Sequence, residues 1–169
     1  MGFSLHEASV PVYMRHLNAL SAILEKAAAY ADQRKIDPAT LLQARLYADM
    51  LPLVFHIQAA CNHARRGTAR LSGAEPAKVG DNQTTFADLQ ALIRGTVEAP
   101  EQVDQNKMEG MADRDVTFPV GEGQMTMTVP NYLVHFSMPG FYFHTTVAYC
   151  ILRHNGLEIG TGDFMGQAR

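Results

Sequence analysis

The chain has 169 residues and a formal net charge of −3, and 47% of its residues are hydrophobic. This length suits one domain with a sizeable core, so we predict a single domain over residues 1–169. No Lys/Arg cluster is longer than the pair Arg65-Arg66, so the chain lacks the electrostatic footprint of a nucleic-acid-binding protein. No apolar run is long enough to span a bilayer, and His6 and Glu7 interrupt any signal-peptide pattern, so no membrane association is expected.

The two cysteines, Cys61 and Cys150, both lie within helical patterns. Buried reduced thiols are typical of a cytoplasmic protein, because disulfides persist mainly in oxidising compartments. We therefore predict a cytoplasmic protein with two free thiols. A disulfide between two packed helices is the alternative.

Helical periodicity predicts a first long helix over residues 4–32. Pro11 then lies in its first turn or bends it, since an interior proline removes a hydrogen bond. Asp37-Pro38 is typical of a cap followed by a first-position proline. These residues predict a short helix through about Leu46.

A second long helix is predicted to follow, with Asp49 as its cap and Pro52 in its first turn. Its apolar positions continue to Leu71, and Gly73 is expected to end it. Residues 74–80 then form a loop.

The third helix has a capping-box pattern, with Thr84 or Thr85 as cap and Asp88 three residues after Thr85. Pro100 is expected to end or kink this helix. The polar stretch over residues 101–111 has room for one more helical turn.

The strand signal lies in two alternating runs, Asp115–Val120 and Gln124–Val129. Between them stands Gly121-Glu122-Gly123, which predicts a hairpin with a three-residue loop. An isolated hairpin is marginally stable in water, so this one is expected to pack on the helices.

The stretch from Thr128 to Gly156 is predicted to be one apolar helix around which the others pack. Pro130 suits its first turn, whereas Pro139 falls inside it and should bend the axis near Gly140. Residues 157–169 are expected to form an irregular tail.

A second apolar face of this last helix carries Met138, Tyr142 and Tyr149. An apolar patch of this kind is expected to be covered in solution. We therefore predict that these residues form a homodimer interface.

The order of these elements resembles the DinB-like (DinB/YfiT) superfamily of four-helix bundles. The resemblance is carried by ASVPVYMRHLNALSAILEKA at the start, DMLPL in the second helix and YLVHFSMPGFYFHTTVAYCILRHNGLEIG at the end. The last motif is similar to a bacterial domain-of-unknown-function family within that superfamily, and the resemblance covers nearly the whole chain. It implies an all-α, up-down-down-up four-helix bundle with a small β-hairpin before the last helix.

DinB-like proteins often hold a divalent metal with three histidines, one from the second helix and two, spaced HxxxH, from the fourth. The resemblance places these ligands at His56 and His144, but the remaining one falls on Gly140, which has no side chain to bind a metal. His135 is the candidate substitute, although on a straight helix it lies about half a turn away from His144. A divalent metal, zinc or nickel, held by His56, His144 and His135 is therefore the candidate cofactor.

Asp49, His56 and His63 recur every seven residues and so share one face of the second helix. One interpretation is a polar stripe lining a pocket, with the carboxylate orienting His56 for metal ligation or proton transfer. The other is that Asp49 only caps the helix and His63 faces solvent. The predicted pocket comprises Asp49, His56, Gly140 and His144.

Two functions are consistent with these residues. The first is a non-catalytic or degenerate DinB-like homodimer that binds a small molecule in a pocket near His56 and His144. The second is a divalent-metal-dependent enzyme of the thiol transferase or hydrolase type with histidine ligands. A third, weaker hypothesis is a stress-response module that binds another protein through the apolar face of the last helix.

Overall fold

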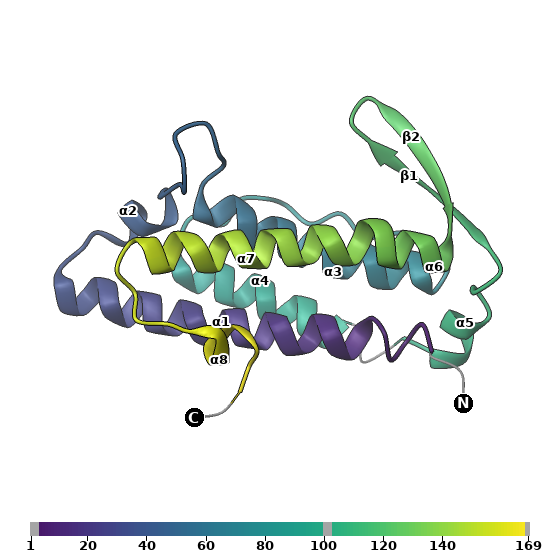
Figure 1. The fold of residues 1–169 in the computed structure, drawn as a ribbon, viewed down its shortest axis with the longest axis horizontal. Helices are drawn as coiled ribbons and strands as arrows, with labels where there is room; N and C mark the ends of the chain where they lie inside the picture. Colours follow the sequence, from purple (N-terminus) through teal and green to yellow (C-terminus); the bar gives the residue numbers. More distant parts are fainter. Residues whose placement is uncertain (1–3, 100–102, 168–169) are drawn as a thin grey trace.

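Four long helices run side by side in an up-down-down-up bundle (Figure 1). The computed structural model describes residues 4–99 and 103–167. The bundle helices are α1 (Val10–Arg34), α3 (Leu53–Leu71), α4 (Phe86–Glu98) and α7 (Met138–His154). The shorter elements are α2 (Pro38–Leu42), α5 (Gln105–Glu109), β1 (Asp115–Val120), β2 (Gly123–Thr128), α6 (Val129–Tyr132), the π-helical turn η2 (Leu133–Ser137) and α8 (Thr161–Phe164). The predicted all-α bundle with a hairpin before the last helix is confirmed.

Local capping signals fix several of the helix starts. Asp37 accepts a hydrogen bond from the backbone N–H of Ala39 at 2.9 Å, as its position before a proline predicts. Thr85 and Asp88 form the predicted reciprocal capping box at the start of α4. Pro11 lies in the first turn of α1, which begins at Val10 rather than at residue 4.

Asp49 does not cap α3, so this prediction is wrong. The helix begins only at Leu53, and no side chain in the described chain caps it. A main-chain contact takes that role, because the Leu53 N–H donates to the carbonyl of Ala44 at 2.9 Å. Asp49 is exposed in the turn before the helix.

The last helix is irregular one turn earlier than predicted. The backbone widens into a π-helical turn at Leu133–Ser137, where the N–H of Met138 donates to the carbonyl of Leu133. This wide turn directly precedes Pro139, which has no N–H to donate. The Ser137 hydroxyl points into the bundle and bonds the hydroxyl of buried Tyr13 at 2.8 Å. The irregularity thus lies at η2 and not near Gly140.

The hairpin turn is also tighter than predicted. Val120 pairs with Gly123, so the loop has two residues, Gly121 and Glu122, instead of three. Gly121 takes a positive φ of 58°, which glycine adopts at low cost at a hairpin turn. Phe118 anchors the hairpin on the bundle, with its ring centroid 4.5 Å from that of Phe136.

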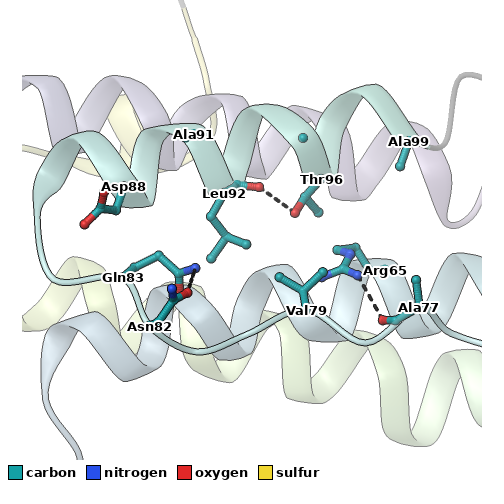
Figure 2. Close-up of a pocket in the computed structure, with 11 residues that line it drawn as sticks. Arg65, Ala77, Val79, Asn82, Gln83, Asp88, Ala91, Leu92, Thr96 and Ala99 are labelled. Atoms are coloured by element: carbon teal, nitrogen blue, oxygen red, sulfur yellow. Dashed lines mark hydrogen bonds between the residues drawn. The ribbon is translucent and has the colours of Figure 1, made fainter.

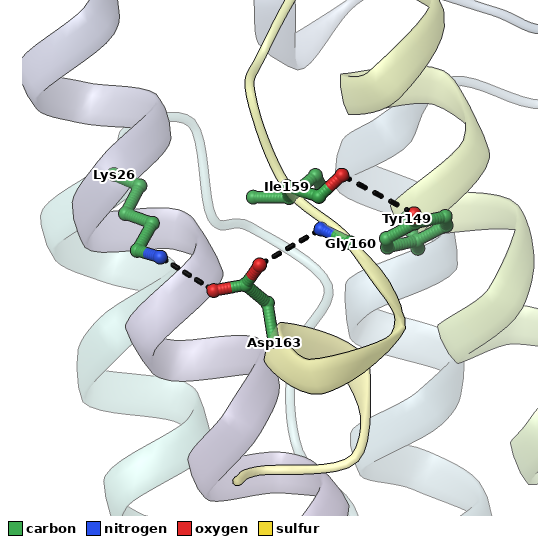
Figure 3. Close-up of polar contacts among 5 residues, drawn as sticks. All are labelled: Lys26, Tyr149, Ile159, Gly160 and Asp163. Atoms are coloured by element: carbon green, nitrogen blue, oxygen red, sulfur yellow. Dashed lines mark hydrogen bonds and ion pairs between the residues drawn. The ribbon is translucent and has the colours of Figure 1, made fainter. Parts of the chain in front are cut away.

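The C-terminal segment folds back across α1 and α7 (Figure 3). Asp163 forms an ion pair with Lys26 at 2.5 Å and accepts a hydrogen bond from the Gly160 N–H at 2.8 Å. Tyr149 donates to the carbonyl of Ile159 at 3.4 Å, and its ring packs edge-on against Phe164. The tail therefore contains a short helix, α8, and covers Tyr149, one of the residues predicted for a dimer interface.

The two cysteines form no disulfide with each other: Cys61 and Cys150 are both free thiols. Among the helices of the described chain, none combines the length and the apolar character needed to cross a bilayer.

Candidate functional site

A cluster of three histidines lies between α3 and α7. His56 and His63 stand two turns apart on α3, and His144 of α7 lies between them. The Nδ1 atoms of His56 and His144 are 3.0 Å apart, a hydrogen-bond distance. The ring centroids of His63 and His144 are 5.5 Å apart. We call His56, His63 and His144 the histidine cluster.

The His63 imidazole fills the space beside Gly140. A Cβ atom built on Gly140 would lie 2.2 Å from Cε1 and 2.6 Å from Nε2 of His63. Real Cβ atoms essentially never come so close to another atom, so the His63 ring would have to move before any side chain could stand at position 140. His63 is accordingly half-buried against α7, and the expectation that it faces solvent is wrong.

Burial keeps the three imidazoles neutral at pH 7. It is the main cause that lowers the pKa of His144 to about 4, and the neighbouring His63 and His56 lower it further. Burial also lowers the pKa of His56 and of His63 below the ordinary value. A hydrogen bond between two Nδ1 atoms requires one donor and one acceptor, which two neutral rings of opposite tautomer supply.

A cavity of about 580 Å³ opens beside the cluster, with His63 and His144 on its wall. Its other walls come from α3, from the segment that follows it, and from α6 and η2. Their side chains combine aromatic rings with hydrogen-bond donors, namely Phe55, Tyr132, Phe136, Asn62, Arg66, Arg70 and Lys78. Such a mixture is typical of a small-molecule site. We call this space the histidine cavity.

Two of the predicted site residues lie elsewhere. His135 is exposed in η2 and, within the described chain, makes no ring contact with the histidine cluster. Asp49 is exposed in the turn before α3 and does not line the histidine cavity. His56 contacts His144, and Gly140 adjoins His63, but of the four predicted pocket residues only His144 lines the histidine cavity.

Several residues of the site were not predicted. Arg66 and Arg70 lie close enough to His63 to lower its pKa, and Arg70 also donates to the Tyr132 hydroxyl at 3.0 Å. Their spacing of three and seven residues from His63 along α3 was a usable signal. The contact between His63 and Gly140 had no such signal, because it depends on how α3 and α7 align.

The residues present do not fit the three-histidine metal site that the resemblance implies. Position 140 offers no donor atom, so the ligand that the resemblance places there is missing. Within the described residues, no three His, Cys, Asp or Glu side chains are grouped to hold a metal ion. Zinc sites in proteins take three or four such ligands.

Comparison with known proteins relates the chain to a family of sequences and to solved structures. The sequence model of a family described as a domain of unknown function (DUF1993) matches residues 5–165. The crystal structure of a DinB family member protein from Shewanella denitrificans is similar, with a TM-score of 0.90 and 35% sequence identity. The similarity covers 96% of this chain and 92% of that one. A search of the curated proteins finds no match.

Proposed function

Because the chain belongs to the DUF1993 family and has a DinB-like fold, we propose that it is a non-catalytic binding protein that holds a small molecule in the histidine cavity. The observation that carries this proposal is the position of the His63 ring. It takes the space that a ligating side chain at position 140 would need. The three-histidine metal site of the DinB-like proteins therefore lacks one ligand in this chain.

The cavity wall offers chemistry suited to recognition. His63 and His144 present neutral imidazoles that can donate or accept a hydrogen bond, and Arg66 adds a fixed charge. Phe136 and Tyr132 offer flat apolar surface, on which a ring or chain can lie. These features support binding of a small molecule that carries both polar and apolar groups.

The homodimer remains part of the proposal. Val134 and Phe143 are 57% and 56% exposed, and Tyr142 is 37% exposed, so α7 and η2 keep an apolar outer surface. Met138 packs against the core and Tyr149 lies under the tail. We therefore propose a dimer contact around Tyr142, extended through Phe143.

A second candidate is the divalent-metal-dependent enzyme of the thiol transferase or hydrolase type, with zinc or nickel. One observation favours it: the Nδ1 atoms of His56 and His144 lie 3.0 Å apart, close to the separation of two nitrogens that share one metal ion, and burial favours the neutral form of both rings, which ligates metals. The two candidates differ in what the purified protein carries.

Native mass spectrometry of protein purified without a histidine tag separates the candidates. We expect the mass of a dimer with an organic molecule and without stoichiometric metal. Ala59→Phe should weaken binding of the molecule, because Ala59 lines the histidine cavity and a phenyl ring there would project into it. One divalent ion per chain, lost in His144→Ala, would favour the enzyme. A protein that carries neither an organic molecule nor a metal ion would contradict small-molecule binding.

A further inference from the structure

A second cavity lies on the other side of α3, away from the histidine cluster. It has a volume of about 600 Å³ and is bounded by α4 and by the segment that returns from α3 to α4. Figure 2 shows Arg65 and Ala77 at one end and Asp88 at the other, with Leu92 and Val79 between them. The volume lies in the range of small-molecule sites.

Arg65 brings an unsatisfied charged group to this cavity. Its Nη2 donates to the carbonyl of Ala77 at 3.0 Å, whereas its buried Nη1 has no hydrogen-bond partner among the described residues. A buried guanidinium donor left without an acceptor is costly. Asp81 lies near enough to favour the charged guanidinium, but its carboxylate accepts from Asn62 Nδ2 at 3.3 Å instead.

The middle of the cavity, between Arg65 and Asp88, is mainly apolar and open. Leu92 and Val79 face the space, and Val79 is 40% exposed. Gly95 leaves the α4 side free, since a Cβ atom built there meets no atom of the described chain within 4 Å. The apolar part thus adjoins the Arg65 guanidinium.

We propose that this cavity binds a small carboxylic acid with a short apolar chain, its carboxylate on the Arg65 guanidinium and its chain over Leu92 and Val79. A carboxylate satisfies a guanidinium better than a neutral acceptor does, because the hydrogen bond is charge-assisted. Asp88 at the opposite end repels the carboxylate and so sets the direction of the ligand.

The test is calorimetric titration of the full chain with hexanoate, with 1-hexanol as the neutral probe. Hexanoate should bind saturably and more tightly than the alcohol. Arg65→Gln should weaken hexanoate binding by about tenfold or more and abolish its advantage over 1-hexanol. Gly95→Leu should weaken binding of both probes, because Gly95 lines the cavity and the new side chain would project into it.

The matched control is Arg66→Gln, which removes the same charge from the next residue of α3. Arg66 lines the histidine cavity and not this one, so hexanoate affinity should stay within about twofold. Equal losses in the two arginine variants, or no saturable binding by the native chain, would overturn the proposal. If Arg65→Gln fails to fold, as circular dichroism would show, hexanoate binding of undiminished affinity in folded Gly95→Leu would also overturn it.

Discussion

Gly140→Ala is expected to destabilise the protein, although alanine normally stabilises a helix. The new methyl group would lie 2.2 Å from Cε1 of His63, so the imidazole must leave its place against α7. Overpacking of this kind costs about 1–3 kcal/mol, which exceeds the ~0.5–1 kcal/mol that alanine gains over glycine in a helix. Urea unfolding, followed by circular dichroism, measures the difference.

A double-mutant cycle isolates the contact. In a His63→Ala background the methyl group has room, so Gly140→Ala should then stabilise by about 0.5–1 kcal/mol. Gly95→Ala in α4 is the matched control, because its Cβ position is free of described atoms, and it should stabilise by a similar ~0.5–1 kcal/mol. If Gly140→Ala in the native background behaved like Gly95→Ala, the His63 ring would not occupy that space.

Acid should unfold the protein partly through His144. Its pKa lies at about 4 in the fold against 6.5 ordinarily, so below pH 6.5 the unfolded chain binds the extra proton more readily. The stability that the neutral ring contributes is complete above pH 6.5 and is lost as the pH falls toward 4. Because His144 is partly exposed, the loss attributable to it is about 1–2 kcal/mol. Urea midpoints measured between these pH values give the slope.

The control for this pH dependence is His144→Asn. Its amide does not titrate in this range, yet it can still hydrogen-bond to Nδ1 of His56. The free energy of unfolding should fall less steeply with acid in this variant than in the native chain. His56 and His63 remain and shift in the same direction, so part of the slope should persist. Equal slopes for both proteins would show that His144 titrates normally in the fold.

The sequence predicted those features that depend on neighbouring residues. Thr85 and Asp88 are three residues apart, and their capping box needs no other part of the chain. The alternating runs around Gly121 likewise specify the hairpin locally, with an error of one residue in its loop. The proximity of His56 and His144 was predicted only from the family resemblance, because a known fold already specifies how the helices pack.

The remaining features depend on contacts between distant segments. Leu53 takes its main-chain partner from Ala44, which no pattern around Asp49 reveals. Tyr149 is covered by the C-terminal segment, which was predicted from its sequence to be an irregular tail. The contact between His63 and Gly140 depends on how α3 and α7 align with each other. The periodicity of a single helix does not predict that alignment.

The contact between His63 and Gly140 can be observed directly by proton NMR of the native chain at pH 7. With the imidazole seated on the glycine, the Hε1 proton of His63 should show a strong nuclear Overhauser effect to an Hα proton of Gly140. The same cross-peak should be absent in His63→Ala. A native spectrum without it, with the His63 ring turned toward solvent, would leave the space at position 140 empty and contradict the account.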